Sequence, residues 1–213
     1  MPRAKRSAVR PKPRGAYHHK DLKRALIAAA LELIDEQGLE AVTIRTLARR
    51  LGVSHAAPAH HFADRQALLD EVATQSFLGF CDTLEAAASR RADPVERLEA
   101  IGVAYVRFAV EHPAAFRAMM TRGPPGEVPA LPELYHAVER AFGILHGAAT
   151  AVVDERRLAR TADELSLAAW AQVHGLARLW IDGPARWLFS GRAAFEAAAK
   201  EAIRLIVEGV VPR

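Results

Sequence analysis

The sequence predicts an all-α protein, with an N-terminal three-helix head on a C-terminal helical bundle. Two observations favour this fold: apolar residues recur at helical spacing over most of the chain, and no segment alternates apolar and polar residues as a strand does. Hydrophobic residues make up 51% of the 213 residues, which is enough for a sizeable core. We divide the chain into an arm (residues 1–19), a head (residues 20–66) and a body (residues 67–213).

The N-terminal end of the chain is strongly basic. Residues 1–65 hold 13 Lys and Arg against 6 Asp and Glu, whereas the remaining residues hold 16 against 19. This asymmetry is typical of a protein that displaces counterions from DNA phosphates at one end. The arm combines six basic side chains with three prolines, so we expect it to be disordered when free. It either follows the DNA minor groove or only improves solubility.

The head contains two helical segments joined by a tight turn. Thr43 can cap a first helix whose apolar residues fall at helical spacing up to Leu51. Gly52 can take the left-handed conformation that ends a helix, and Ser54 is a candidate cap for the next one. The small Ala48 lets the two helices cross closely. An ordinary helical hairpin is the alternative, but this pattern is the signature of a helix-turn-helix and indicates DNA binding.

The second helix, over about residues 55–62, is the predicted recognition helix of the major groove. It offers three alanines that let it sit deeply and three histidines that can hydrogen-bond bases or phosphates. It has no Arg, Asn or Gln for a bidentate base contact, so we expect modest direct readout. Because Pro58 has no N–H, we expect a short helix that begins late, at His55 or Ala56, with Ala57 pushed out of the helical region.

The run from Leu26 to Leu69, which includes GLEAVTIRTLARRLGVS, HHF and ADRQALL, resembles the DNA-binding domain of the tetracycline-repressor (TetR) family. Ala59 stands where that family usually has a phosphate-binding tyrosine, and Pro58 where it has an aliphatic residue, so His60 or His61 would have to replace the tyrosine contact. The residues that fit the family pattern are Gly52, Val53, Ser54, Phe62 and Arg65. The expected DNA contacts are Thr43, Arg45, Ser54, His55, Ala57, His60, His61 and Arg65.

The body is predicted to consist of helices throughout. A long helix runs from near Asp64 to Ser89. Asp93 as cap, proline at the next position and glutamate three residues after the cap are a strong signal for a second helix, which ends near His112. A short helix with Phe116 and the loop RGPPGEVPALP follow. Three further helices are predicted over roughly residues 132–153, 161–181 and 192–210.

The last two of these helices carry apolar faces that we expect to form a homodimer. The faces contain Ala168, Ala171 and Gly175 in the first helix and Ala198, Ala202 and Leu205 in the second. Two such helices per subunit can build a four-helix interface about a two-fold axis; alternatively, both faces belong to the core of one subunit. A two-fold dimer would place two recognition helices one DNA turn (~34–36 Å) apart and require a near-palindromic operator.

The run WAQVHGLARLWIDG resembles the Trp-x-x-x-His-Gly segment of one C-terminal subgroup of the TetR family, as do the segments YHH, DPVERL and EHPAAFRAMM. The resemblance implies that an unidentified small-molecule effector binds among the C-terminal helices. Methionines and aromatic residues make adaptable apolar walls, and histidines add polar selectivity. The candidate effector-binding residues are Tyr105, Phe108, Phe116, Met119, Met120, Phe142, His146, Trp170 and His174. His174 either contacts the effector or hydrogen-bonds a neighbouring helix.

Other classes of protein are disfavoured. Cys81 is the only cysteine, which excludes an intramolecular disulfide. Neighbouring histidines diverge on a helix and no Cys/His cluster has zinc spacing, so we expect no metal and no cofactor. No enzyme motif is recognisable. Neither a membrane-spanning segment nor a secretory signal is present, which predicts a cytoplasmic protein.

Together these features predict a DNA-binding transcriptional regulator and not an enzyme. The mechanism we expect is a homodimeric repressor of a near-palindromic DNA operator, released when a small-molecule effector binds the DNA-incompetent arrangement more tightly. An architectural DNA-binding protein without an effector would share the basic arm and the helix-turn-helix, and it remains the alternative.

Overall fold

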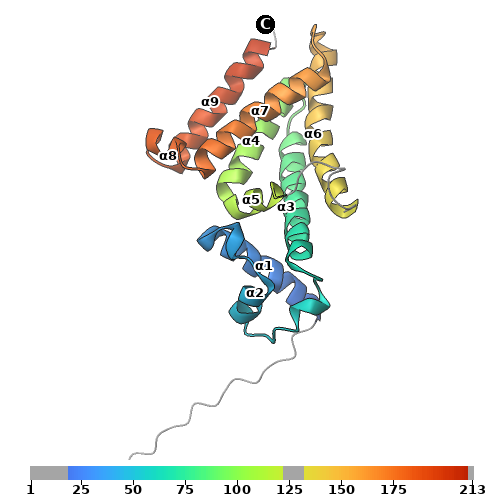
Figure 1. Ribbon diagram of the computed structural model, residues 1–213. Coiled ribbons are helices and arrows are strands. Elements are labelled where there is room, and N and C mark those ends of the chain that lie inside the picture. Colours follow the sequence, from blue (N-terminus) through green and yellow to red (C-terminus); the bar gives the residue numbers. More distant parts are fainter. Residues whose placement is uncertain (1–18, 122–131, 211–213) are drawn as a thin grey trace, which may run out of the picture.

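A computed structural model describes residues 19–121 and 132–210, which form a helical head and a helical body (Figure 1). Every regular element of this described part is a helix, which confirms the predicted all-α class. The basic arm up to residue 18 and nearly all of the predicted loop RGPPGEVPALP lie outside the described residues. Within residues 19–121 and 132–210, no helix combines the length and the apolar character needed to cross a membrane.

The head has an apolar core of its own. Leu26 on the first helix, Leu47 on the second and Phe62 after the last turn are all buried in it. Helices in proteins gain most of their stability from tertiary packing, so the head depends on the mutual burial of these side chains. Its elements are α1 (His19–Gln37), the 3₁₀ turn η1 (Leu39–Ala41), α2 (Ile44–Leu51) and the 3₁₀ turn η2 (Pro58–His60).

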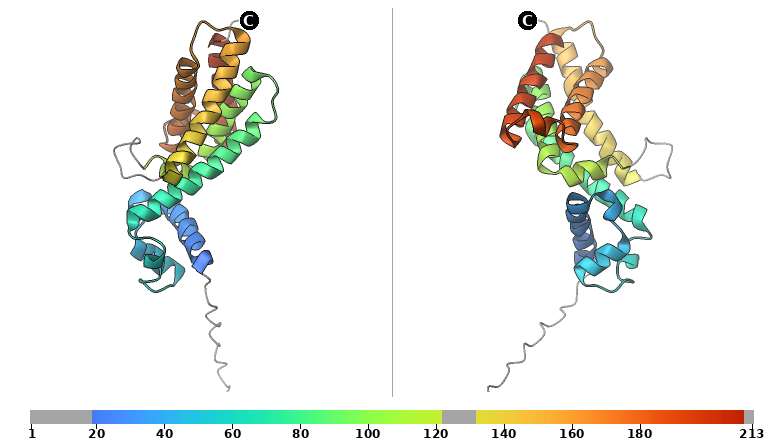
Figure 2. Two further views of the ribbon diagram at one scale, coloured as in Figure 1. Left: turned by 90° about the vertical axis from the view of Figure 1, so that its right-hand side faces the viewer. Right: turned by 60° about the vertical axis from the view of Figure 1, so that its left-hand side comes forward.

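Helix α3 (Arg65–Ala88) is shared by the head and the body (Figure 2). The Asp64 carboxylate caps it by accepting a hydrogen bond from the backbone N–H of Ala67 at 2.7 Å. Leu68 near its start is buried in the head core, and Phe80 further along is buried in the body core. The predicted start near Asp64 and end near Ser89 are confirmed.

Helices α4 (Pro94–Glu111) and α5 (Pro113–Met119) follow. The Asp93 carboxylate accepts hydrogen bonds from the backbone N–H groups of Val95 and Glu96 at 2.8 and 3.0 Å, as the sequence predicts for this helix start. The same carboxylate also pairs with Arg156 at 2.6 Å, at the far end of another helix. Both the backbone N–H groups and the Arg156 guanidinium lower the pKa of Asp93.

The remaining helices complete the body. Thr161 and Glu164 form the reciprocal capping box that starts one of them, because each side chain bonds the backbone N–H of the other. A one-turn helix after Gly183 was not predicted, since four residues are too few to show a periodic pattern. These helices are α6 (Pro132–Arg156), α7 (Ala162–Ile181), α8 (Ala185–Leu188) and α9 (Arg192–Val210).

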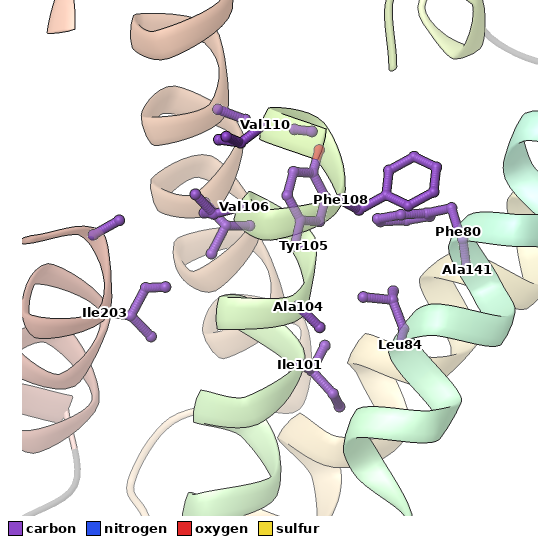
Figure 3. Packing of buried hydrophobic residues seen from close by; sticks show 14 of the residues in the cluster. Phe80, Leu84, Ile101, Ala104, Tyr105, Val106, Phe108, Val110, Ala141 and Ile203 are labelled. Atoms are coloured by element: carbon purple, nitrogen blue, oxygen red, sulfur yellow. The ribbon is translucent and has the colours of Figure 1, made fainter. Parts of the chain in front are cut away.

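Aromatic rings mark the centre of the body core. Figure 3 shows Phe80 of α3 beside Tyr105 and Phe108 of α4. The Phe80 ring meets both of these rings edge to face, with centroids 5.1 and 5.2 Å apart. This geometry is favourable for aromatic quadrupoles and fixes α3 against α4.

Candidate nucleic-acid interface and internal cavity

Helix α2 begins and ends as its sequence predicts. The Thr43 hydroxyl accepts a hydrogen bond from the backbone N–H of Thr46, and the Thr43 N–H donates to the Thr46 hydroxyl, both at 3.0 Å. Gly52 has φ 65°, in the left-handed region, and its N–H bonds the last turn of α2. Ala48 is completely buried, as the close approach of another segment requires. The predicted cap and the predicted stop are therefore confirmed.

The segment 54–62 folds as tight turns and not as the predicted α-helix. Its backbone N–H groups, from Ala57 to His61, bond carbonyls three residues earlier at 2.9–3.4 Å, except at Pro58, which has no N–H. Only residues 58–60 form a 3₁₀ turn. Ala57 has helical φ and ψ of −59° and −44°, so the expectation that Pro58 would push it out of this region is wrong. Burial of Pro58 in the head outweighs that local preference.

These tight turns present an exposed edge. Pro58 and Phe62 are buried and anchor the segment to the head, whereas Ala57 and His61 are half-buried. Packing of the two buried residues therefore anchors the backbone of the edge, while the side chains of the edge are exposed to solvent. The exposed residues of the edge are Ser54, His55, Ala56, Ala59 and His60.

Three arginines of α2 have different environments. Arg45 and Arg49 are exposed, and neither forms an ion pair or side-chain hydrogen bond within the described part of the chain. Arg50 instead donates to both carboxylate oxygens of Glu36 at 2.6 and 2.8 Å, which lowers the pKa of Glu36. Arg49 was not among the expected DNA contacts; its position four residues after Arg45, on the same helical face, is the signal that could have identified it.

Arg65, an expected phosphate contact, is engaged within the head. Its Nε donates to the carbonyl of Val42 at 2.6 Å and its terminal nitrogen donates to the carbonyl of Leu39 at 3.0 Å. The carboxylate of Glu40 lies 3.7 Å away. These bonds join the start of α3 to η1 and to the residue before Thr43, so the guanidinium helps to position α2.

We expect Arg65→Ala to lower the free energy of unfolding by about 1.5–3 kcal/mol, the usual contribution of hydrogen bonds that involve a charged group. Urea denaturation followed by circular dichroism measures this change. Arg90→Ala is the matched control, because Arg90 is exposed just after α3 and its loss should leave stability unchanged. Equal stability of both variants would contradict a structural role for Arg65.

The body encloses a cavity of 430 Å³ between α3, α4, α6, α7 and α9. Its volume lies in the range of ordinary small-molecule sites. Figure 3 shows part of its wall, where Phe80 and Leu84 of α3 and Ile101 and Tyr105 of α4 lie close together. Leu134 and Phe142 of α6, Trp170 and Val173 of α7, and Ile203 of α9 also line it.

The structure divides the expected effector-binding residues into two groups. Tyr105, Met119, Met120, Phe142 and Trp170 line the cavity. The other four lie behind or outside its wall: Phe108 and Phe116 are buried core residues, His174 bonds Tyr105, and His146 stacks on Phe142 and lies 3.3 Å from the Ser166 hydroxyl.

Tyr105 and His174 form a pair between α4 and α7. The Tyr105 hydroxyl lies 2.9 Å from Nδ1 of His174. Burial raises the pKa of Tyr105 to about 12, although interaction with Trp170 opposes this. Burial also lowers the pKa of His174, with a further decrease from nearby Arg178. The neutral forms of both groups are therefore favoured, and a neutral imidazole can accept the proton of the tyrosine hydroxyl.

The short helix α5 contacts both cores. Ala114 and Ala118 are buried in the head cluster, against α1. Phe116 and Met119, on the other side of the same helix, are buried in the body cluster, and Met119 lines the cavity. A molecule in the cavity that displaced α5 would therefore also displace side chains that pack in the head core.

Helix α7 leaves an apolar stripe uncovered. Leu167, Ala171, Gly175 and Leu179 lie four residues apart, on one face, and all are exposed; Leu167 is 63% exposed. On α9, the neighbouring Leu205 is 68% exposed. Large exposed apolar side chains clustered in this way mark interaction surfaces.

An all-α head with a capped helix, a left-handed glycine turn, an exposed edge and exposed arginines is typical of helix-turn-helix proteins. A family described as "Bacterial regulatory proteins, tetR family" matches residues 26–72. A second, described as "Tetracyclin repressor-like, C-terminal domain", matches residues 98–202. The chain belongs to the TetR family of transcriptional regulators. Its place in the Trp-x-x-x-His-Gly subgroup stays a prediction.

Curated relatives match only part of this chain. The chain is 47% identical to Tetracycline repressor protein class C of Escherichia coli over 51 residues, 24% of this chain and 23% of that protein. It is 42% identical to the HTH-type transcriptional regulator BetI of Rhizobium meliloti (strain 1021) over 81 residues, 37% of this chain and 39% of that protein. The chain thus spans less than two fifths of the length of these curated relatives.

A solved structure extends the similarity to the body. The structure of a protein with unknown function from Rhodococcus sp. RHA1 is 30% identical and covers 93% of this chain and 100% of its own, with a TM-score of 0.77.

Proposed function

We propose that this protein is a homodimeric transcriptional repressor that binds a near-palindromic operator and leaves it when a small molecule fills the cavity. The observation that carries the DNA-binding part is the exposed edge formed by Ser54, His55, Ala56, Ala59 and His60, together with two exposed arginines of α2. These are Arg45 and Arg49, and neither has an ion-pair partner among the described residues. Repression of this kind entails the cytoplasmic location expected from the sequence.

Contacts to DNA divide into two kinds under this proposal. Arg45 and Arg49 neutralise phosphates, because each is exposed and lacks a carboxylate partner within the described residues. The edge residues Ser54, His55 and His60 approach the bases, with Ala57 and His61 at the margin. Thr43 and Arg65 hold the backbone that carries these groups. A single 3₁₀ turn inserts fewer side chains than a helix, so DNA shape and two half-sites supply much of the specificity.

The homodimer rests on the uncovered stripe of α7 and on Leu205 of α9. Small residues at positions 171 and 175 let two helices approach closely about a two-fold axis. The alternative expected from the sequence, that this face packs within its own subunit, finds no support in the exposure of Leu167 and Leu179.

Release by an effector rests on the position of α5. A ligand that displaces Met119 moves a helix whose opposite side packs in the head core. Because coupling is reciprocal, operator DNA must weaken ligand binding by the same factor, typically about 5–150-fold. Ligand affinity measured with and without operator tests this relation.

The decisive experiment is selection of binding sites from random DNA, followed by gel shift with unlabelled random competitor at moderate salt. A repressor should select a near-palindrome and stay bound in excess competitor. An architectural protein, the second candidate, should select no sequence and should be competed away.

Arg45→Ala and Arg49→Ala should each weaken binding to all DNA sequences. In a dimer each substitution removes two phosphate contacts, so the slope of log affinity against log salt should become shallower by about two. Fluorescence anisotropy over a salt series measures the slope. Arg50→Ala is the matched control on the same helix; its guanidinium is held by Glu36 and Glu32, so the slope should not change. A slope that changes equally in all three variants would reject the specific roles of Arg45 and Arg49.

A further inference from the structure

The cavity in the body has an almost entirely apolar wall. The described residues that line it include Phe, Leu, Ile, Val, Met and Ala side chains but no Asp, Glu, Lys, Arg or His. A charged group placed there would lose its hydration without gaining a counter-charge from these residues, and burial of an unpaired charge is strongly unfavourable. This wall therefore selects against ions.

Apolar character continues to the surface at one side of the cavity. Met120, Phe142 and Trp170 line the cavity and are also 38%, 47% and 44% exposed. They come from the end of α5, from α6 and from α7. Because these three side chains line the cavity and are also exposed to water, they form the margin of the cavity. A ligand that enters there passes over an apolar surface.

Besides the Trp170 indole, the described wall residues include three polar side chains, and two of these already form a hydrogen bond within the protein. The Tyr105 hydroxyl lies 2.9 Å from Nδ1 of His174. The Gln172 amide nitrogen donates to the carbonyl of Ala202 at 2.6 Å. The Tyr135 hydroxyl is different: it is buried and has no hydrogen-bond partner within the described part of the chain. Buried hydroxyls are normally paired, so this one requires an explanation.

We infer that the ligand of this cavity is an uncharged, mostly apolar molecule with one hydrogen-bonding oxygen, such as an alcohol or a ketone, and that Tyr135 bonds that oxygen. The inference rests on the proposed effector role of the cavity and specifies its chemistry. The wall holds the apolar part of the ligand, and the ligand oxygen gives the Tyr135 hydroxyl the partner that it lacks among residues 19–121 and 132–210.

Linear alcohols and acids of equal length test the inference on the full chain. Titration calorimetry at pH 7.5 compares 1-hexanol, 1-octanol and octanoate. Each buried methylene is worth about fourfold in affinity, so 1-octanol should bind about 15-fold more tightly than 1-hexanol. Octanoate, which is ionised at this pH, should bind at least about 100-fold more weakly than 1-octanol. Octanoate affinity equal to that of 1-octanol would overturn the inference.

Two hydroxyl-removing variants test the assignment of the oxygen. Tyr135→Phe should lower the affinity for 1-octanol about fivefold, the value of one ordinary hydrogen bond. Ser76→Ala is the control, because it removes a buried hydroxyl of α3 that lies outside the cavity wall and is bonded to the carbonyl of Val72, and it should leave the affinity within about twofold. Unchanged affinity in Tyr135→Phe, or equal losses in both variants, would overturn the role of Tyr135. Circular dichroism verifies that each variant is folded.

Operator release is measured separately, so that the two proposals can fail independently. If 1-octanol binds as expected but the operator stays bound, the ligand class stands and the effector role fails. If 1-octanol does not bind, but an ionic compound binds in the cavity and releases the operator from the protein, the ligand class is overturned and the effector role stands.

Discussion

Ala171→Glu is expected to convert the proposed dimer into monomers and to lower affinity for the proposed operator at least about 100-fold, because two linked half-sites bind far more tightly than one. Ala171 lies between Leu167 and Gly175 on the uncovered stripe of α7. A glutamate there would be buried against its symmetry-related copy, and two unpaired carboxylates in an apolar interface are strongly destabilising. Analytical ultracentrifugation gives the oligomeric state, and a gel shift with the selected operator gives the affinity.

The subunit itself should still fold in this variant, since position 171 is exposed in the single chain. Ala86→Glu is the matched control: Ala86 is also an exposed alanine of a long helix, α3, but lies outside the stripe. It should remain dimeric with unchanged operator affinity. A dimeric Ala171→Glu protein with full affinity would place the subunit interface elsewhere.

Phe116→Ala is expected to lower the free energy of unfolding by about 3–5 kcal/mol, the usual cost of removing a buried phenylalanine. Phe116 has no exposed surface, and its ring meets those of Tyr105 and His174 with centroids 5.8 and 5.6 Å away. The residue lies on α5, so its loss also loosens the helix that contacts both cores. Urea denaturation at fixed protein concentration measures the change, since dimerisation would make stability depend on concentration.

Phe142→Ala is the control for this measurement. Phe142 is 47% exposed at the margin of the cavity, so its truncation removes less buried area than that of Phe116. The substitution should lower the free energy of unfolding by about 1 kcal/mol or less. The two variants should also differ in ligand response. Phe142→Ala should weaken ligand binding without changing operator affinity in the absence of ligand. Comparable losses of stability would mean that Phe116 is less tightly packed than its burial indicates.

Helix starts and stops were the most predictable part of the fold. Thr43, Gly52, Asp64 and Asp93 act within one turn of their own positions, through a side-chain oxygen or a permissive backbone. Such local chemistry does not depend on the rest of the chain. The sequence alone therefore locates these boundaries correctly.

The recognition segment was less predictable. Its alanines and histidines are compatible with a helix, and Pro58 is compatible with the first turn of one. The structure instead buries Pro58 in the head and leaves residues 54–62 in tight turns. Whether a proline starts a helix or anchors a turn depends on the surface it packs against, which local pattern does not reveal.

The candidate sites show the same division. The amino-acid pattern alone determined the helical class, the helix-turn-helix with its basic end, and a set of aromatic and methionine residues in the body. Tertiary structure decided that Arg65 bonds carbonyls and that Phe116 is a core residue while Met119 lines the cavity. It also decided that the Tyr135 hydroxyl has no hydrogen-bond partner in the described part of the chain. The helical periodicity of a sequence indicates which face of a helix is apolar. Only the packing of several helices decides which apolar side chains touch one another and which surround empty space.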